Sequence, residues 1–245
     1  MNWLHHIRSF RGSAAGTALI EAALTIPLLI YLVTGTIELC RYAQFQQKLE
    51  DSAQKMVNLL NQQPYLLSTE IDSLQSVASD VMSPFTVSNI CYPSSSVKSP
   101  GAICIYVSAI QQNAPPSGTG NCKNPPSYMG TQKISCPADV MWQVMPTGQS
   151  KGPGSQIAPK GGCTGSQTPV SCPQVTTLPG GQSWETVLQQ KDQAIVVEIY
   201  LQYTPLLNIP GINLIENTAY HYQMAFATPR LGQFQSPPAG SIPQR

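Results

Sequence analysis

The chain has 245 residues and a formal net charge of +1; only 10% of its residues are charged, and it contains 22 prolines and 18 glycines. A nearly neutral chain has no electrostatic attraction for nucleic acid or for an acidic substrate, and no motif for a dinucleotide, a phosphate or RNA is present. We therefore expect no nucleic-acid partner and no cofactor. The length allows one membrane-anchored helix and one exported domain of about 180 residues.

A short basic leader precedes an apolar segment of membrane length. Residues 1–16 carry Arg8 and Arg11, and no residue in the range 22–37 is charged. A helix of about 20 apolar residues spans a bilayer, and basic residues on the amino side favour a cytoplasmic amino terminus. The sequence therefore predicts a single-pass protein whose carboxy-terminal part is exported.

One acidic residue, Glu21, stands at the start of the apolar segment, five positions after Gly16. An acid inside a membrane costs about 2.5–3.5 kcal/mol, so it usually indicates a function and a partner. The alternative is that Glu21 lies at the membrane edge and extends toward Arg8 or Arg11. Pro27 lies within the segment, where it frees one backbone carbonyl and favours a kink.

Two other kinds of export signal fit this segment less well. A secretory signal peptide could be cut near residues 33–35, but its apolar core is shorter and uncharged, which argues against this alternative. A lipoprotein signal is excluded because Leu39, rather than a small residue, precedes Cys40.

Helical periodicity continues beyond the apolar segment and stops before Pro64. We expect one helix from residue 17 to 61, which would be about 65 Å long at 1.5 Å per residue. With the two residues that follow its end, this membrane and amphipathic segment spans residues 17–63. The side chains expected to form its buried stripe are Tyr42, Phe45, Leu49, Ser52, Ala53, Met56, Leu59 and Leu60. A second, shorter helix is expected over residues 68–82.

The exported domain is expected to span residues 64–235 and to be mostly β-structure. Strands are predicted at residues 85–87, 103–107 and 140–144 because these runs are rich in β-branched and aromatic residues. Two stretches rich in proline, glycine and serine, at residues 111–131 and 146–182, are predicted to be long loops.

The clearest strand is residues 194–203, in which alternate positions are apolar. Residues 213–228 can return antiparallel to it, and residues 236–245 are expected to form a flexible tail. A long helix followed by antiparallel strands predicts an α+β fold, with the helix packed on the sheet as in pilins.

Six of the seven cysteines lie beyond residue 90 and are candidates for disulfides in an oxidising compartment: Cys91, Cys104, Cys122, Cys136, Cys163 and Cys172. Six cysteines allow 15 pairings. Pairing of nearest neighbours, which includes Cys91 with Cys104 and Cys163 with Cys172, is the simplest hypothesis. The seventh, Cys40, is interpreted as a buried apolar residue or as an intermolecular crosslink. The lack of a CxxC pattern makes a metal site a poor alternative.

Two stretches resemble the TadE- and TadF-like pseudopilins of tight-adherence (Tad) type IV pilus systems. The first is the basic leader with Gly16, Glu21 and Pro27, and the second is residues 194–207, a strand with Glu and Tyr that closes on Tyr-x-Pro-Leu. The resemblance implies that a prepilin peptidase cuts between Gly16 and Thr17, and that Glu21 serves assembly.

The resemblance also implies a location and partners. The protein is expected in the inner membrane with its exported domain in the periplasm, or in the extracellular pilus, as a minor pseudopilin. Expected partners are a TadE- or TadF-like pseudopilin, the major Flp-type pilin and the inner-membrane pilus platform. The alternative is an uncleaved membrane-anchored adhesin or envelope scaffold protein. An enzyme is not expected, and Glu185, Asp192 and Glu198 are interpreted as charges at the surface or sheet edge.

Overall fold

The computed structural model describes residues 14–62, 68–88, 91, 101–112, 138–147, 149, 152–157, 174–175, 193–206 and 220–228. The chain divides into two compact units. The first comprises Met1–Gln44 and Pro205–Glu216, and the second comprises Phe45–Thr204 and Asn217–Arg245.

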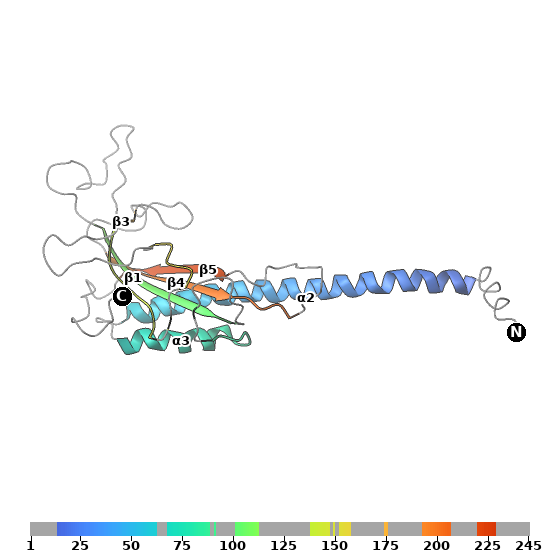
Figure 1. The fold of residues 1–245 in the computed structure, drawn as a ribbon, viewed down its shortest axis with the longest axis horizontal. Coiled ribbons are helices and arrows are strands. Elements are labelled where there is room, and N and C mark those ends of the chain that lie inside the picture. The colour runs from blue at the N-terminus through green and yellow to red at the C-terminus, as the bar shows by residue number, and fades with distance from the viewer. Residues whose placement is uncertain are drawn as a thin grey trace, which may run out of the picture. The chain divides into compact units, whose positions relative to one another are not determined.

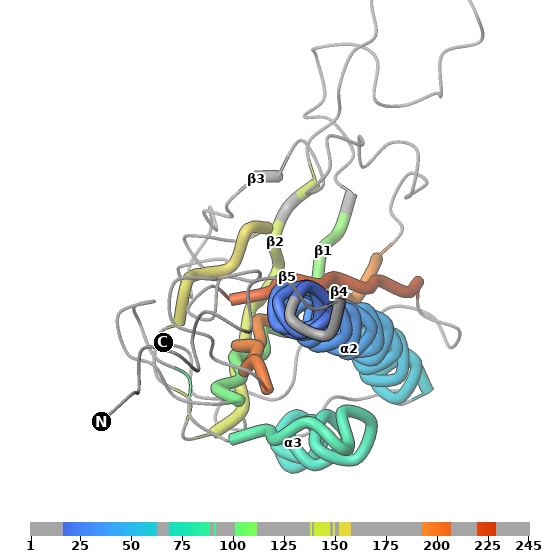
Figure 2. Tube along the Cα trace, turned by 90° about the vertical axis from the view of Figure 1, so that its right-hand side faces the viewer, coloured from blue at the N-terminus to red at the C-terminus, as the bar shows by residue number. Residues whose placement is uncertain are grey.

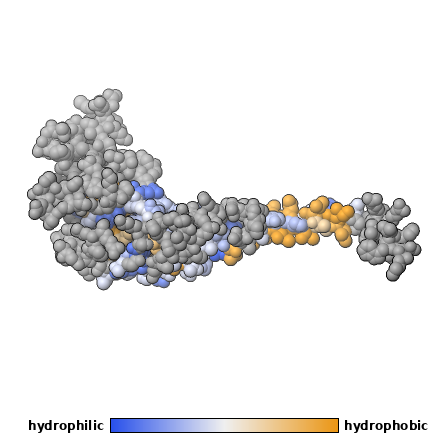
Figure 3. Space-filling view, viewed as in Figure 1, coloured by the Kyte–Doolittle hydropathy of each residue, from blue (hydrophilic) through white to orange (hydrophobic). Residues whose placement is uncertain are grey.

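Helix α2 covers Ala14–Asn61 (Figure 1). The helix expected from residue 17 to 61 is therefore present and begins three residues earlier. Within the described residues, α2 is the one helix whose length and apolar composition suffice to cross a membrane. In the first unit, the large apolar side chains of α2 are exposed; Leu24, for example, is 72% exposed. They appear as the orange stretch in Figure 3.

Three threonine hydroxyls of this apolar stretch are satisfied by the helix itself. The hydroxyls of Thr25, Thr34 and Thr36 donate to backbone carbonyls four residues earlier, at 2.7, 2.8 and 2.8 Å. A hydroxyl bonded in this way needs no water, which lets threonine reside in lipid. Pro27 lies inside α2 as expected and has no N–H to give to the carbonyl of Ala23.

The second unit contains a five-stranded antiparallel sheet in the order β3-β2-β1-β4-β5. The strands are β1 (Ile103–Gln112), β2 (Ala138–Val144), β3 (Gln174–Val175), β4 (Gln193–Gln202) and β5 (Tyr220–Ala227). The predictions for residues 103–107, 140–144 and 194–203 are confirmed, and β5 lies within the predicted return segment. Together with α2, this sheet confirms the predicted α+β class.

Strand β4 has neighbours on both sides, β1 and β5, and every residue after Gln193 is buried. Successive side chains of β4 point to opposite faces of the sheet, and both faces are covered. The alternation does not distinguish a core face from a solvent face. Ile199 lies opposite Ile105 of β1 on one face, and Glu198 lies opposite Tyr106 on the other.

The helices of the second unit cover the Ile199 face. Figures 1 and 2 show α3 (Ser68–Met82) and the second half of α2 on the same side of the sheet. The Lys48 ammonium of α2 donates to the carbonyl of Val81 in the last turn of α3, at 3.1 Å, where a cation complements the helix dipole. The expected stripe of α2 is buried from Phe45 onward except at Leu59, which is 43% exposed.

One sequence prediction about this unit was wrong. Residues 85–87 form no strand, because the Phe85 N–H bonds back to the carbonyl of Met82 at 2.8 Å and continues the turn that ends α3. Within the stretch 146–182, predicted to be a loop, the described residues 152–157 are neither helix nor strand, and Gln174–Val175 pairs with β2.

Candidate functional site

The predicted processing and assembly residues lie on the first half of α2. The Gly16–Thr17 bond falls in the first turn of the helix, which begins at Ala14. Glu21 is exposed on the same helix, about 7.5 Å further along the axis at 1.5 Å per residue. The structure therefore places the predicted cleavage point and the acid on one continuous apolar helix.

A second acid of α2, Glu38, lies in residues 35–41, which also resemble the TadE- and TadF-like pseudopilins, but the sequence predicted no role for it. Its side chain is only 3% exposed, and its Oε2 accepts the backbone N–H of Leu206 at 3.2 Å. Both residues belong to the first unit. Leu206 is the last residue of the Tyr-x-Pro-Leu pattern. The pattern therefore ends at a residue whose backbone N–H donates to a buried carboxylate of α2. Periodicity does not reveal such a pair because 168 residues separate its members.

The first residue of the same pattern, Tyr203, packs in the second unit. Its ring centroid lies 4.9 Å from that of Phe45 of α2, edge to face, and Phe85 contacts Phe45 at 5.4 Å. Each such aromatic pair contributes about 0.5–1.5 kcal/mol beyond its burial.

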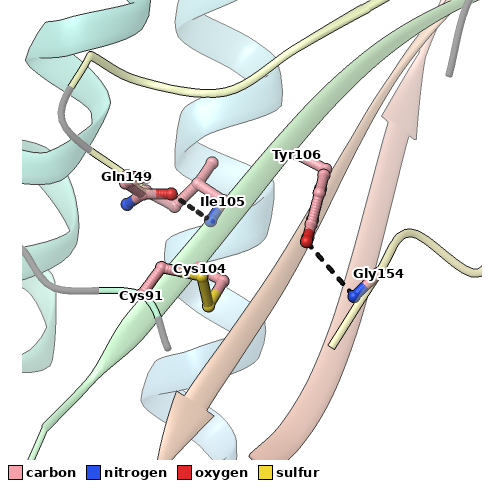
Figure 4. Close-up of a disulfide and its surroundings, with 6 residues drawn as sticks. All are labelled: Cys91, Cys104, Ile105, Tyr106, Gln149 and Gly154. Carbon is pink, nitrogen blue, oxygen red and sulfur yellow. Dashed lines mark hydrogen bonds between the residues drawn. A yellow bond between two sulfur atoms is a disulfide. The ribbon is translucent and has the colours of Figure 1, made fainter. Parts of the chain in front are cut away.

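Cys91 and Cys104 form a disulfide, which confirms the nearest-neighbour hypothesis for this pair. Their Cα atoms are 4.9 Å apart, and both residues are fully buried on the face of the sheet opposite the helices (Figure 4). The other candidates, Cys122, Cys136, Cys163 and Cys172, lie outside the described residues. Cys40 is a free, exposed cysteine, so its interpretation as a buried residue was wrong.

Residues 149 and 152–157, here called the strap, cross the face that carries the disulfide. The side-chain Oε1 of Gln149 accepts the N–H of Ile105 at 2.9 Å, and the N–H of Gly154 donates to the Tyr106 hydroxyl at 3.2 Å (Figure 4). Gly154 has a φ of 89°, a conformation that favours glycine.

At Gly152 the strap touches the disulfide itself. A Cβ atom added there would lie 2.4 Å from Sγ of Cys91 and 2.5 Å from Sγ of Cys104. These distances are far below a van der Waals contact, so only glycine lets the strap approach the two sulfurs this closely.

Glu198, interpreted from the sequence as a charge at the surface or sheet edge, is instead fully buried on the interior strand β4. Its Oε2 accepts the hydroxyl of Ser155. Its Oε1 accepts the N–H of Gln156 at 2.8 Å and the hydroxyl of Tyr222 at 3.2 Å. Burial raises the pKa of Glu198 above its ordinary value, and the hydrogen bonds from Ser155, Gln156 and Tyr222 oppose that rise.

Tyrosines surround this carboxylate. The ring of Tyr200 lies 4.9 Å from that of Tyr222 and 5.9 Å from that of Tyr106. Burial, and then the charge of Glu198, raise the pKa values of Tyr200 and Tyr222, so both phenols stay protonated and can donate hydrogen bonds.

On the helix side of the sheet, His221 of β5 occupies an aromatic pocket. Its ring lies 5.4 Å from that of Phe45 and 6.3 Å from that of Tyr203. Nε2 of Gln46 lies 3.1 Å from its Nδ1, and burial lowers the pKa of His221. Donation by the Gln46 amide to Nδ1 requires the neutral imidazole.

Titration of His221 is expected to contribute to the pH dependence of the unfolding free energy. A lowered pKa means that the folded state holds its proton less well, so stability is lost as pH falls from about 6.5 toward the folded pKa. Both proteins are expected to lose unfolding free energy as the pH falls from 7 to 5. The His221→Phe variant should lose less than the wild-type protein, by up to about 1.4 kcal/mol for each pH unit. Urea titrations of both proteins measure this. Identical pH profiles would show that His221 does not titrate on folding.

Within the described residues, no three or more histidine, cysteine, aspartate or glutamate side chains are grouped so that they could hold a metal ion. The described sites thus consist of the part of α2 in the first unit, which carries the acids Glu21 and Glu38, and a sheet face closed by a strap and a disulfide.

Comparison with known proteins bears on the first of these sites. Searches of curated proteins and of solved structures found no match. The family model described as TadE, TadE-like protein, matches residues 16–56. This range begins at Gly16, contains Glu21 and Glu38, and ends within the buried stripe of α2. Residues 16–56 of this chain are therefore TadE-like.

Proposed function

We propose that the protein is a minor pseudopilin that helps to assemble or initiate a Tad pilus. The observation that carries this proposal is the TadE-like match to residues 16–56. The matched range includes the part of α2 that is apolar and exposed, and α2 is long enough to cross a membrane.

The proposed mechanism uses the amino end of α2. A prepilin peptidase hydrolyses the bond between Gly16 and Thr17, which leaves a new α-amino group on Thr17. The Glu21 carboxylate of a neighbouring subunit neutralises that ammonium in lipid, where an unpaired charge is costly. This pairing sets the axial register between two helices.

The remaining elements support this role. The hydroxyls of Thr25, Thr34 and Thr36 are bonded within α2 and so need no water in lipid. In our proposal the amino terminus faces the cytoplasm and the second unit lies in the periplasm or in the pilus. Its partners are a TadE- or TadF-like pseudopilin, the Flp-type pilin and the inner-membrane platform, and its role is not enzymatic.

Gly16→Ile tests the proposal. A branched side chain at the bond to be cut should block processing, so the variant should migrate as the precursor and cells should lose pili. Gly12→Ile places the same side chain four residues before Gly16 and serves as the matched control, with normal processing and piliation.

One outcome would contradict the proposal. If wild-type protein and Gly16→Ile have the same mass and the cells make the same number of pili, the chain acts outside the prepilin pathway. The role of an uncleaved membrane-anchored adhesin or scaffold would then replace the proposal.

A further inference from the structure

Several contacts hold residues 152–157 of the strap to the sheet. Gly152 lies against the disulfide, Gly154 donates to the Tyr106 hydroxyl, and Ser155 and Gln156 donate to Glu198. Ile157 completes the attachment in an apolar cluster with buried residues of β1, β2 and β4. Of these contacts, the one to Glu198 involves a group whose charge depends on pH.

The surroundings of Glu198 contain several phenols. The titratable groups that face it are Tyr106 from β1, Tyr200 from β4, and Tyr220 and Tyr222 from β5. Within the described part of the chain, no lysine, arginine or histidine bonds or ion pairs with Glu198, and the described strap residues add no titratable side chain. Among the described residues, the groups that stabilise this buried carboxylate when it is ionised are therefore hydrogen-bond donors.

A buried charge without a cation is costly, since hydrogen bonds replace only part of its lost hydration. Opening of the strap would remove Ser155 and Gln156 from Glu198 and return water to the carboxylate. The open state would then tolerate the ionised form better than the closed state does.

We propose that the strap is a proton-tightened latch, in which protonation of Glu198 holds residues 152–157 closed over the sheet and the disulfide, and ionisation loosens them. The direction rests on the burial of Glu198, which disfavours the ionised form more than the hydrogen bonds from Ser155 and Gln156 favour it and so raises the pKa of Glu198. By linkage, acid then favours closure. Because Gly152 covers both sulfurs, closure also shields the disulfide from reductants.

Hydrogen exchange by mass spectrometry on the full-length chain in detergent micelles tests the latch. Peptides that cover residues 152–157 are followed between pH 4.5 and 7.5 and corrected for intrinsic exchange rates. In wild-type protein, the opening constant of the strap should fall by up to about tenfold for each unit of acidification within the window between the open and closed pKa values.

Glu198→Gln keeps the shape of the protonated acid and carries no charge. Its strap should be as protected at pH 7.5 as the wild-type strap is in acid, and its opening constant should not change with pH. Glu50→Gln, at an exposed acid of α2, is the matched control and should keep the wild-type response.

Two further observations distinguish opening of the strap from a change in the stability of the whole fold. Titration of His221 loosens the fold in acid, so it cannot produce a strap that tightens in acid. Gly152→Ala, whose Cβ would clash with the sulfurs, should open the strap at every pH and speed reduction of the disulfide by a phosphine. Equal pH dependence of strap exchange in wild type and Glu198→Gln, or faster corrected exchange in acid, would overturn the proposal.

Discussion

Glu21→Gln protein is expected to insert into the membrane and to be cut after Gly16, yet to support few or no pili. The substitution keeps the shape of the side chain and makes the apolar helix cheaper to insert. It removes the charge that would pair with the α-amino group of a neighbouring subunit. Loss of one partner from a buried ion pair costs about 3–5 kcal/mol, which corresponds to about two to four orders of magnitude in association.

The experiment compares piliation by electron microscopy with the amount and mass of the protein in membrane fractions. Glu50→Gln, an exposed acid further along α2, removes the same charge outside the apolar segment and should leave piliation unchanged. Normal piliation with Glu21→Gln would mean that the carboxylate is only a charge at the membrane edge.

Removal of the Cys91–Cys104 disulfide is expected to have the second large effect. The two cysteines are 13 residues apart, and closure of a loop of this size stabilises a fold by about 3 kcal/mol. The Cys91→Ala and Cys104→Ala double variant should lose about this amount, measured by urea titration followed by near-ultraviolet circular dichroism. It should also lose protection at the strap, because Gly152 packs on the two sulfurs.

Cys40→Ala is the matched control, since Cys40 is free and exposed. Its unfolding free energy should stay within about 0.5 kcal/mol of wild type, as is usual for surface changes. A double variant with wild-type stability would show that the disulfide fastens neither the strap nor the sheet.

The elements that could be predicted from the sequence are those with a strong local pattern. Helix α3 has the predicted bounds because its apolar residues recur at helical spacing, and β4 follows from an uninterrupted alternation. Residues 85–87 show the limit of this reasoning. Three apolar or β-branched residues also suit a turn after a helix, and Phe85 packs on Phe45 rather than into the sheet.

The buried sites depend on contacts between distant segments, and so they were missed. Glu198 resembles a solvent-side residue of an alternating strand, and its burial requires Ser155 and Gln156, which lie 43 and 42 residues away. The polar composition of the strap predicted a loop, yet glycine and serine are what let it lie flat on the disulfide and the carboxylate. The pairing of Cys91 with Cys104 could be predicted because it is local.

The intact mass of wild-type protein, purified from the cell envelope and measured without reduction, tests the central claim most directly. Processing as a pseudopilin predicts a chain that lacks residues 1–16 and begins at Thr17, with the Cys91–Cys104 peptide recovered as a disulfide. A mass that still includes residues 1–16 in assembled, pilus-bearing cells would contradict the account.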